Sequence, residues 1–132
     1  VQIVNNFNHK YAVTSRHFNR DHQSRALFIQ HLPVGKPVVQ FLVQRNKHKS
    51  IIEIRDNGIT YIYSEDGRTV ITRYPMRGYA IQELYKMTNT RPNYKLVENG
   101  NKVNRQFKEF DKKMRHKNVK KDNLVIDTYN KI

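Results

Sequence analysis

The sequence contains no cysteine, which excludes disulfide bonds and zinc sites built from thiolates. Glycine is also scarce, with five residues in the whole chain, so few loops can bring their backbone close to a phosphate. The glycine-rich patterns of nucleotide-binding loops and the short signatures of zinc proteases and serine hydrolases are absent. No apolar run approaches the roughly 20 residues that a helix needs to cross a bilayer. From these absences we expect no metal and no cofactor.

Acidic residues are few: 11 Asp and Glu stand against 25 Lys and Arg, which gives a formal net charge of +14. A surplus of this size raises the local concentration of polyanions and speeds their encounter with the protein. Nucleic acid, an anionic membrane surface and an acidic stretch of another protein are the candidate partners, and charge alone does not choose among them. The 132 residues fit one domain with one modest core.

The first 25 residues are polar, rich in histidine and asparagine, and without clear periodicity. A short strand is possible at residues 1–4, and the segment as a whole reads as either a flexible lead-in or an irregular edge. We therefore expect a basic polar lead-in over residues 1–25 and a single domain over residues 26–132. The start lacks an initiator Met and the layout of a signal peptide, which favours a fragment of a longer chain or a processed product.

Residues 26–74 have the pattern of short strands separated by turns, beginning with an apolar run at 26–31. Val39, Phe41 and Val43 fall on one face of a strand over 38–44, with the period of two that a half-buried strand requires. Turn residues such as Asn57-Gly58 then separate further predicted strands at 50–55, 59–63 and 68–74. Four consecutive strands with short turns predict an antiparallel meander.

After Pro75, which cannot donate to a strand ladder, the pattern becomes mainly helical. The sequence predicts a helix at 76–87, a short strand at 94–97 and a turn at 99–100. It then predicts an amphipathic helix at 101–117 and a closing strand at 124–126. In the amphipathic helix, Val103, Phe107 and Phe110 recur at helical spacing. The predicted fold class is therefore α+β, an antiparallel meander with a C-terminal amphipathic helix packed across it.

The basic residues of the meander and of the last helix are the candidate binding residues for an acidic partner: Arg45, Lys47, Lys49, Arg55, Arg68, Arg73, Arg77, Lys108, Lys112 and Arg115. Cations held on strands, such as Arg55 and Arg73, lose less entropy on binding than cations on a disordered tail. Tyr61, Tyr63 and Tyr74 lie among them, as aromatic residues do in single-strand nucleic-acid binders. The alternatives are a solvated surface helix and tyrosines that only pack within the sheet.

Histidines are the candidate catalytic residues. His17 and His22, with Arg16 and Arg20 nearby, are compatible with a metal-free ribonuclease acid–base pair. Their spacing matches no nucleophile signature, and no third ligand completes a metal site with Asp21. We therefore expect surface histidines, no catalytic residue and no enzyme activity in this domain.

The order of elements in residues 32–132 resembles a polo box, in which a helix packs across an antiparallel sheet. The similar features are Val39-x-Phe41, the strand at 50–54, Ile59-x-Tyr61, the Asp66-Gly67 turn, the strand ending at Tyr74, and the helix at 101–117 followed by a strand at 124–128. This helix-and-strand exit is similar to the first cryptic polo box of the centriole-duplication polo-like kinases. The resemblance implies a non-catalytic, dimer-forming targeting module whose basic surface captures acidic segments of centriolar scaffold proteins. The chain lacks the Trp of phosphopeptide-binding polo boxes, so the resemblance does not extend to their phosphoserine groove.

Three functions follow as hypotheses. The first is a cytoplasmic interaction module, centriolar if the resemblance holds, that binds an acidic segment of a scaffold protein, either as a monomer or as a homodimer. The second is a nucleic-acid-binding domain, whose affinity falls steeply with salt. The third is a small basic ribonuclease toxin that uses His17 or His22.

Overall fold

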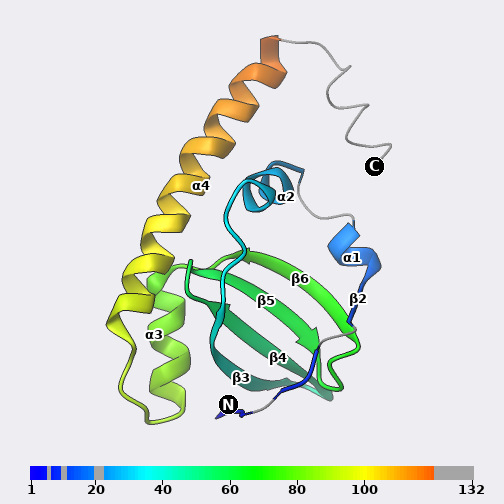
Figure 1. The fold of residues 1–132 in the computed structure, drawn as a ribbon, viewed down its shortest axis with the longest axis vertical. Helices are drawn as coiled ribbons and strands as arrows, with labels where there is room; N and C mark the ends of the chain where they lie inside the picture. The colour runs from blue at the N-terminus through cyan, green and yellow to red at the C-terminus, as the bar shows by residue number, and fades with distance from the viewer. Residues whose placement is uncertain (6, 10–11, 20–22, 121–132) are drawn as a thin grey trace.

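The computed structural model of the chain describes residues 1–5, 7–9, 12–19 and 23–120. Its elements follow in the order β1 (Gln2–Ile3), β2 (Val13–Thr14), α1 (Arg16–Asn19), α2 (Gln23–Gln30), β3 (Pro37–Arg45), β4 (His48–Arg55), β5 (Ile59–Ser64), β6 (Thr69–Pro75), α3 (Gly78–Met87) and α4 (Tyr94–Lys120). The strands form one sheet in the order β1-β3-β4-β5-β6-β2, antiparallel except where β2 joins β6. The predicted α+β class is confirmed, with the meander over β3 to β6 and α4 packed on the sheet (Figure 1).

The meander is held in register by the turn residues between its strands. Phe41 of β3 faces Ile52 of β4, and Ile52 faces Ile62 of β5. Between β4 and β5, Gly58 has a φ of +83°, a left-handed conformation that glycine adopts without the steric cost of a side chain. The side-chain oxygen of Asn57 accepts a 3.0 Å hydrogen bond from the amide of Ile59 and so supports the same turn. Alternation along the strands therefore places one set of side chains on each face of the sheet.

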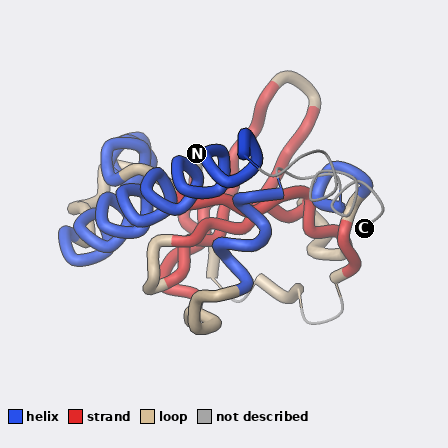
Figure 2. The backbone as a smooth tube through the Cα atoms, turned by 90° about the horizontal axis from the view of Figure 1, so that it is seen from above, coloured by secondary structure: helices blue, strands red, loops and turns tan. Residues whose placement is uncertain are grey.

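The face that carries Phe41 and Ile54 packs against α3 and the first turns of α4. Ile81 and Tyr85 from α3 and Leu96 from α4 join them in one buried cluster, and the rings of Phe41 and Tyr85 meet edge to face at 5.3 Å. Figures 1 and 2 show α4 on one side of the strands and α1 on the other. This arrangement leaves the second face of the sheet to be covered by other segments.

The second face is covered by residues from the segment 1–25, which the sequence predicted to be a lead-in outside the domain. β1 pairs with β3 at one edge of the sheet and β2 pairs with β6 at the other. Phe7 and Phe18 pack against Tyr63 and its buried neighbours on this face. The expected boundary at residue 26 is therefore corrected: the described part of residues 1–25 belongs to the sheet, and α2 runs across that boundary. Short polar strands have no periodic signal of their own, and only pairing with β3 and β6 specifies them.

The apolar run at 26–31 does not form a strand: it is helical as far as Gln30, where α2 ends. An apolar run of this length has no decisive periodicity, so tertiary contacts decide its conformation. In the helix, the ring of Phe28 lies 5.4 Å from that of Phe107 and 5.6 Å from that of Phe110. Ile29 joins the same cluster with Ile59 of β5. α2 therefore packs against both α4 and β5 of the sheet.

The predicted strand at 94–97 and the predicted turn at 99–100 are wrong, because α4 runs without interruption from Tyr94 to Lys120. Gly100 sits inside this helix, where a β-carbon would come within 2.7 Å of the carbonyl oxygen of Met76 and 2.6 Å of Cδ1 of Ile81. The glycine therefore permits close approach of α4 to the start of α3 and does not mark a turn. The predicted closing strand at 124–126 lies outside the described residues.

Candidate anion-binding site

A fully buried carboxylate, that of Glu53, lies at the centre of the second face of the sheet. Its Oε2 is 2.7 Å from Nε2 of His9 and accepts a 2.7 Å hydrogen bond from the side-chain amide of Gln40. Its Oε1 accepts a 3.2 Å bond from Nε of Arg55 and a 3.5 Å bond from the hydroxyl of Tyr63. A buried carboxylate is strongly disfavoured without partners, and here four side chains supply them.

Arg55 is therefore not the free cation that the sequence suggested. It projects on the same face as Glu53, two residues along β4, and only 13 % of its side chain is exposed. Its guanidinium carbon stands 3.9 Å from the centre of the Tyr61 ring, a cation–π contact. Burial and the charge of Glu53 raise the pKa of Tyr63 to about 12, so its hydroxyl stays protonated at neutral pH. The guanidinium is thus held in one orientation by a carboxylate and an aromatic ring.

Arg73 provides the second cation of this face. It lies directly across from Tyr61 on β6, and its guanidinium carbon is 4.9 Å from the centre of the Phe18 ring. The residue is half-buried, and among the residues that the structure describes no carboxylate forms an ion pair with it. Burial lowers the pKa of Arg25, Tyr74 opposes this shift, and the nearby positive charge of Arg73 adds to it. Arg73 therefore stands beside a paired guanidinium, and no ion pair of its own is found among the described carboxylates.

Arg55, Tyr61 and Arg73 line a pocket of about 120 Å³. Its other wall consists of the end of α2 and the loop that follows: Ile29, Gln30, Leu32, Pro33, Val34 and Gly35, with Asn57 and Ile59 completing it. The volume corresponds to roughly four water molecules of liquid, far below the several hundred Å³ of pockets that enclose cofactors. The pocket therefore suits one small anionic group, and the planar donors of arginine match the oxygens of a carboxylate or a phosphate.

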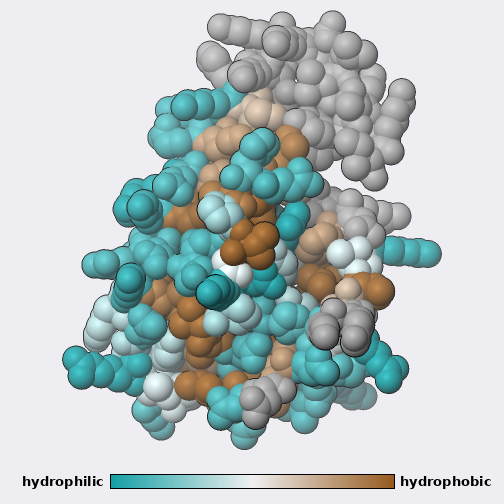
Figure 3. All heavy atoms as spheres, viewed as in Figure 1, coloured by the Kyte–Doolittle hydropathy of each residue, from teal (hydrophilic) through white to brown (hydrophobic). Residues whose placement is uncertain are grey.

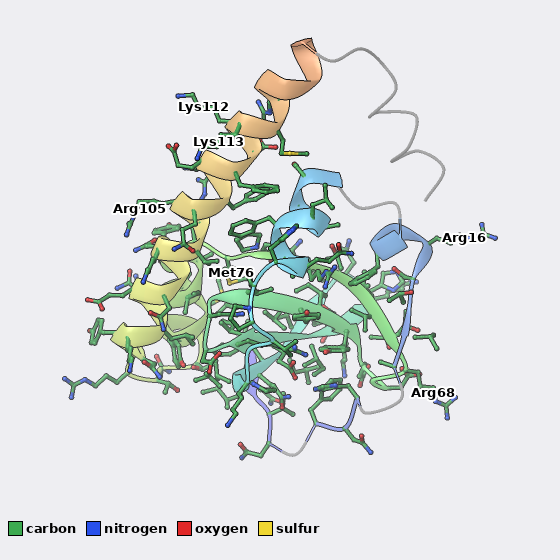
Figure 4. The ribbon with its side chains drawn as sticks, turned by 45° about the horizontal axis from the view of Figure 1, so that its top comes forward. Arg16, Arg68, Met76, Arg105, Lys112 and Lys113 are labelled. Atoms are coloured by element: carbon green, nitrogen blue, oxygen red, sulfur yellow. The ribbon has the colours of Figure 1, made fainter. Side chains whose placement is uncertain are left out.

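The structure does not gather the ten predicted binding residues on one face. Arg55 and Arg73 meet at the pocket, whereas the other eight lie elsewhere: Arg45, Lys47 and Lys49 around the β3–β4 hairpin, Arg68 at the β5–β6 turn, Arg77 before α3, and Lys108, Lys112 and Arg115 on α4. Figure 4 shows Arg105, Lys112 and Lys113 pointing outward from α4 and Arg68 pointing outward on the opposite side of the molecule. Arg115 also pairs with Asp111 one turn earlier. The single docking face expected from the sequence is thus corrected to a small pocket with separate outlying cations.

Sequence reasoning missed His9, Phe18 and Glu53 as parts of this site. Glu53 and Arg55 do carry a local signal, since residues two apart on a strand share a face. His9 and Phe18 reach the site only through tertiary contacts, and no pattern in their own segment marks them. Tyr61, which the sequence places among the strand cations, does lie with its ring against a guanidinium.

The alternative sites receive no support from the described residues. Within residues 1–5, 7–9, 12–19 and 23–120, no group of three or more His, Cys, Asp or Glu residues could hold a metal ion. The side chain of His17 and the whole of His22 lie outside what the structure describes. Among the helices of that same part of the chain, none is long and apolar enough to span a membrane.

The comparisons with known proteins add no relative. No protein-family model, no curated protein sequence and no solved structure matches the chain.

Proposed function

We propose that this protein is a non-catalytic interaction module that binds an acidic segment of a partner protein through the pocket between Arg55 and Arg73. One observation carries the proposal: Arg73 is half-buried, lines a pocket beside a second guanidinium, and forms no ion pair with a described carboxylate. A partly desolvated charge without a counter-ion favours binding of an anion, because the interaction there is screened less than on the open surface.

The pocket wall supports an acidic side chain as the bound group. Leu32, Pro33 and Val34 line the same pocket as Arg55 and Arg73, so an aliphatic stem would contact apolar surface while its carboxylate meets Arg73. Val34 is 87 % exposed, which leaves apolar surface available to such a chain. Glutamate and aspartate side chains combine these two features.

The proposal is tested by fluorescence anisotropy with a labelled Glu-rich peptide. Replacing Arg73 with Gln removes a charge-assisted hydrogen bond worth about 1.5–3 kcal/mol, so the dissociation constant should rise roughly 10- to 150-fold. Arg68→Gln makes the same change of charge at the far turn and should alter affinity by about twofold or less. Equal losses in the two variants would show that only net charge matters and would remove the pocket from the proposal.

A second candidate function, nucleic-acid binding, is favoured by one observation on α4. Arg105, Lys108 and Lys112 are exposed and follow one another at helical spacing. Figure 4 shows Arg105 and Lys112 pointing outward from α4. A row of cations suits a phosphate backbone better than a single pocket does. The test compares binding of a random single-stranded oligonucleotide and of the Glu-rich peptide at physiological salt. If the wild type prefers the oligonucleotide and the Lys108→Gln/Lys112→Gln variant loses this preference, nucleic-acid binding becomes the favoured function.

The polo-box resemblance stays a prediction. The centriolar location, the dimeric state and the parent protein kinase that it implies stay predictions as well. The proposed function does not depend on it. A match would agree with the proposal, because the resemblance also implies capture of acidic segments by a basic surface.

A further inference from the structure

The carboxylate of Glu53 lies between two basic side chains, one from the N-terminal segment and one from the pocket. Its Oε2 is 2.7 Å from Nε2 of His9, and its Oε1 accepts the 3.2 Å bond from Nε of Arg55. Glu53 is fully buried, whereas 24 % of the His9 side chain is exposed. Of these three residues, Arg55 lines the pocket. The imidazole is therefore open to solvent at one end of a chain of contacts whose other end is the binding site.

The charge of the His9–Glu53 pair changes with a single proton. Histidine is the side chain that gains or loses its charge between pH 5 and 8. A ring nitrogen that lies 2.7 Å from a carboxylate oxygen carries its hydrogen in both forms, so Nε2 keeps its contact with Glu53 and Nδ1 takes the extra proton. With a neutral imidazole the pair carries one negative charge, and with a protonated imidazole the pair is neutral.

The other groups around this pair keep their charge over the same range. Tyr63 of β5 stacks on the imidazole, and burial raises its pKa to about 12, so it stays neutral. Arg55 of β4 stays positive, as arginine does in proteins. Gln40 of β3 and Phe7 of the N-terminal segment are uncharged. Between pH 5 and 8 the described part of this network therefore changes charge at the pair.

That change reaches the pocket through the carboxylate. When the imidazole is neutral, the whole negative charge of Glu53 offsets the positive charge of Arg55 and repels an anion that enters the pocket. When His9 is protonated, its charge compensates the carboxylate, and Arg55 attracts the anion with less opposition. These side chains are partly or fully buried, so solvent screens their charges less than it screens charges on the open surface.

We propose that the His9–Glu53 pair makes binding at the Arg55–Arg73 pocket proton-dependent, so that an acidic segment binds more tightly as the pH falls from about 8 to about 5.5. The inference rests on the proposed function, because the ligand is the carboxylate that this pocket binds. His9 lies outside the pocket lining and acts through Glu53. Since linkage is reciprocal, an acidic ligand that favours the protonated form must also take up protons when it binds.

The test measures the dissociation constant of the labelled Glu-rich peptide by fluorescence anisotropy from about pH 8 to about pH 5.5. The glutamates of the peptide stay ionised there, because their ordinary pKa is about 4.3. The wild type should bind about three- to tenfold more tightly at the lower pH. His9→Gln keeps an amide donor for Glu53 and cannot take up a proton, so it should lose most of this gain.

His48→Gln is the matched control, because His48 is an exposed histidine at the start of β4. Figure 3 shows hydrophilic side chains over much of the face seen in Figure 1, and charges in solvent are screened within about 8 Å at physiological salt. His48→Gln should therefore keep the pH dependence of the wild type. A second measurement is calorimetry in two buffers of different ionisation enthalpy, which should show proton uptake when the wild type binds the peptide.

The outcomes separate the inference from the proposed function. If the wild type binds the peptide equally at both pH values and Arg73→Gln weakens binding, the proton link is overturned and the pocket stands. If Arg73→Gln has no effect at either pH, both fall together. If His48→Gln loses the pH dependence as fully as His9→Gln, only net charge matters and the inference is wrong. Proton uptake by the wild type does not depend on how well His9→Gln folds, so its absence alone overturns the inference.

Discussion

Nε2 of His9 lies 2.7 Å from Oε2 of Glu53, and this contact joins the N-terminal segment to the middle of the sheet. The imidazole also stacks on Tyr63, with ring centres 4.5 Å apart. Glu53 in turn orients Arg55, one of the two guanidinium groups of the pocket. The N-terminal segment is therefore linked through two residues to the proposed binding site, and this link is open to direct measurement.

Glu53→Gln should destabilise the protein by about 3 kcal/mol or more, because it leaves Arg55 buried without its counter-charge. His9→Ala should cost less, about 1–2 kcal/mol, since it removes one partner of the carboxylate. In a double-mutant cycle by urea denaturation, we expect a coupling of about 1 kcal/mol or more. Glu98→Gln, at an exposed position on α4, is the control and should be nearly neutral. Strictly additive losses would mean that His9 does not contact Glu53 in solution.

Stability should decline as the pH rises from about 10 to 12, in part through Tyr63. Its pKa is raised to about 12 in the folded protein from an ordinary value of 10, mainly by burial. Between these values the unfolded chain releases the phenolic proton and the folded protein retains it, so the stabilisation present below pH 10 is lost. Allowing for solvent screening, the loss is on the order of 1–2 kcal/mol.

The measurement is thermal unfolding of the wild type and of Tyr63→Phe across that pH range. The variant should show a shallower decline and not a flat profile, because burial also raises the pKa values of Tyr74 and Tyr85. A variant whose decline equals that of the wild type would show that Tyr63 ionises normally in the folded state.

Gly100→Ala should destabilise the protein, although the same change in an exposed helix interior stabilises by about 1 kcal/mol. The new β-carbon would lie 2.7 Å from the carbonyl oxygen of Met76, and backbone cannot yield as a flexible side chain does. We expect a loss of about 1–3 kcal/mol in urea denaturation. Lys102→Ala, two residues along α4 and exposed, should change stability by about 0.5 kcal/mol or less. A gain in stability for Gly100→Ala would indicate that α3 and α4 do not meet at this position.

Phe41→Ala should cost about 3–5 kcal/mol, because the ring is fully buried between the sheet and α3. Phe110→Ala should cost about half as much, since that ring is only partly buried against Phe28. Urea denaturation of both variants gives the comparison. A larger loss at Phe110 than at Phe41 would mean that the cluster of α2 with α4, and not the α3 side, forms the main core.

Local periodicity accounts for the parts of the fold that the sequence predicted well. Alternation in 38–44 and the Asn57-Gly58 turn are signals contained within a few residues, and the meander formed as they indicate. The same reasoning misread Gly100 as a turn residue, because a glycine that permits helix contact and a glycine that ends a helix look alike in sequence. It also misread 26–31, where an apolar run is compatible with either a strand or a helix.

The sequence by itself determined the net charge, the alternation of the four central strands and the apolar stripe of the last helix, since composition and periodicity are properties of neighbouring residues. Only the tertiary structure decided which cations are buried, paired or available. Arg55 became a buried cation because the N-terminal segment and α2 cover the sheet face that it shares with its partner Glu53. Arg73 came to lie beside it because β6 follows β5 with Tyr61 opposite. Contacts between residues far apart in the chain depend on which segments pack on each face of the sheet. The pattern of neighbouring residues in the sequence does not specify that packing.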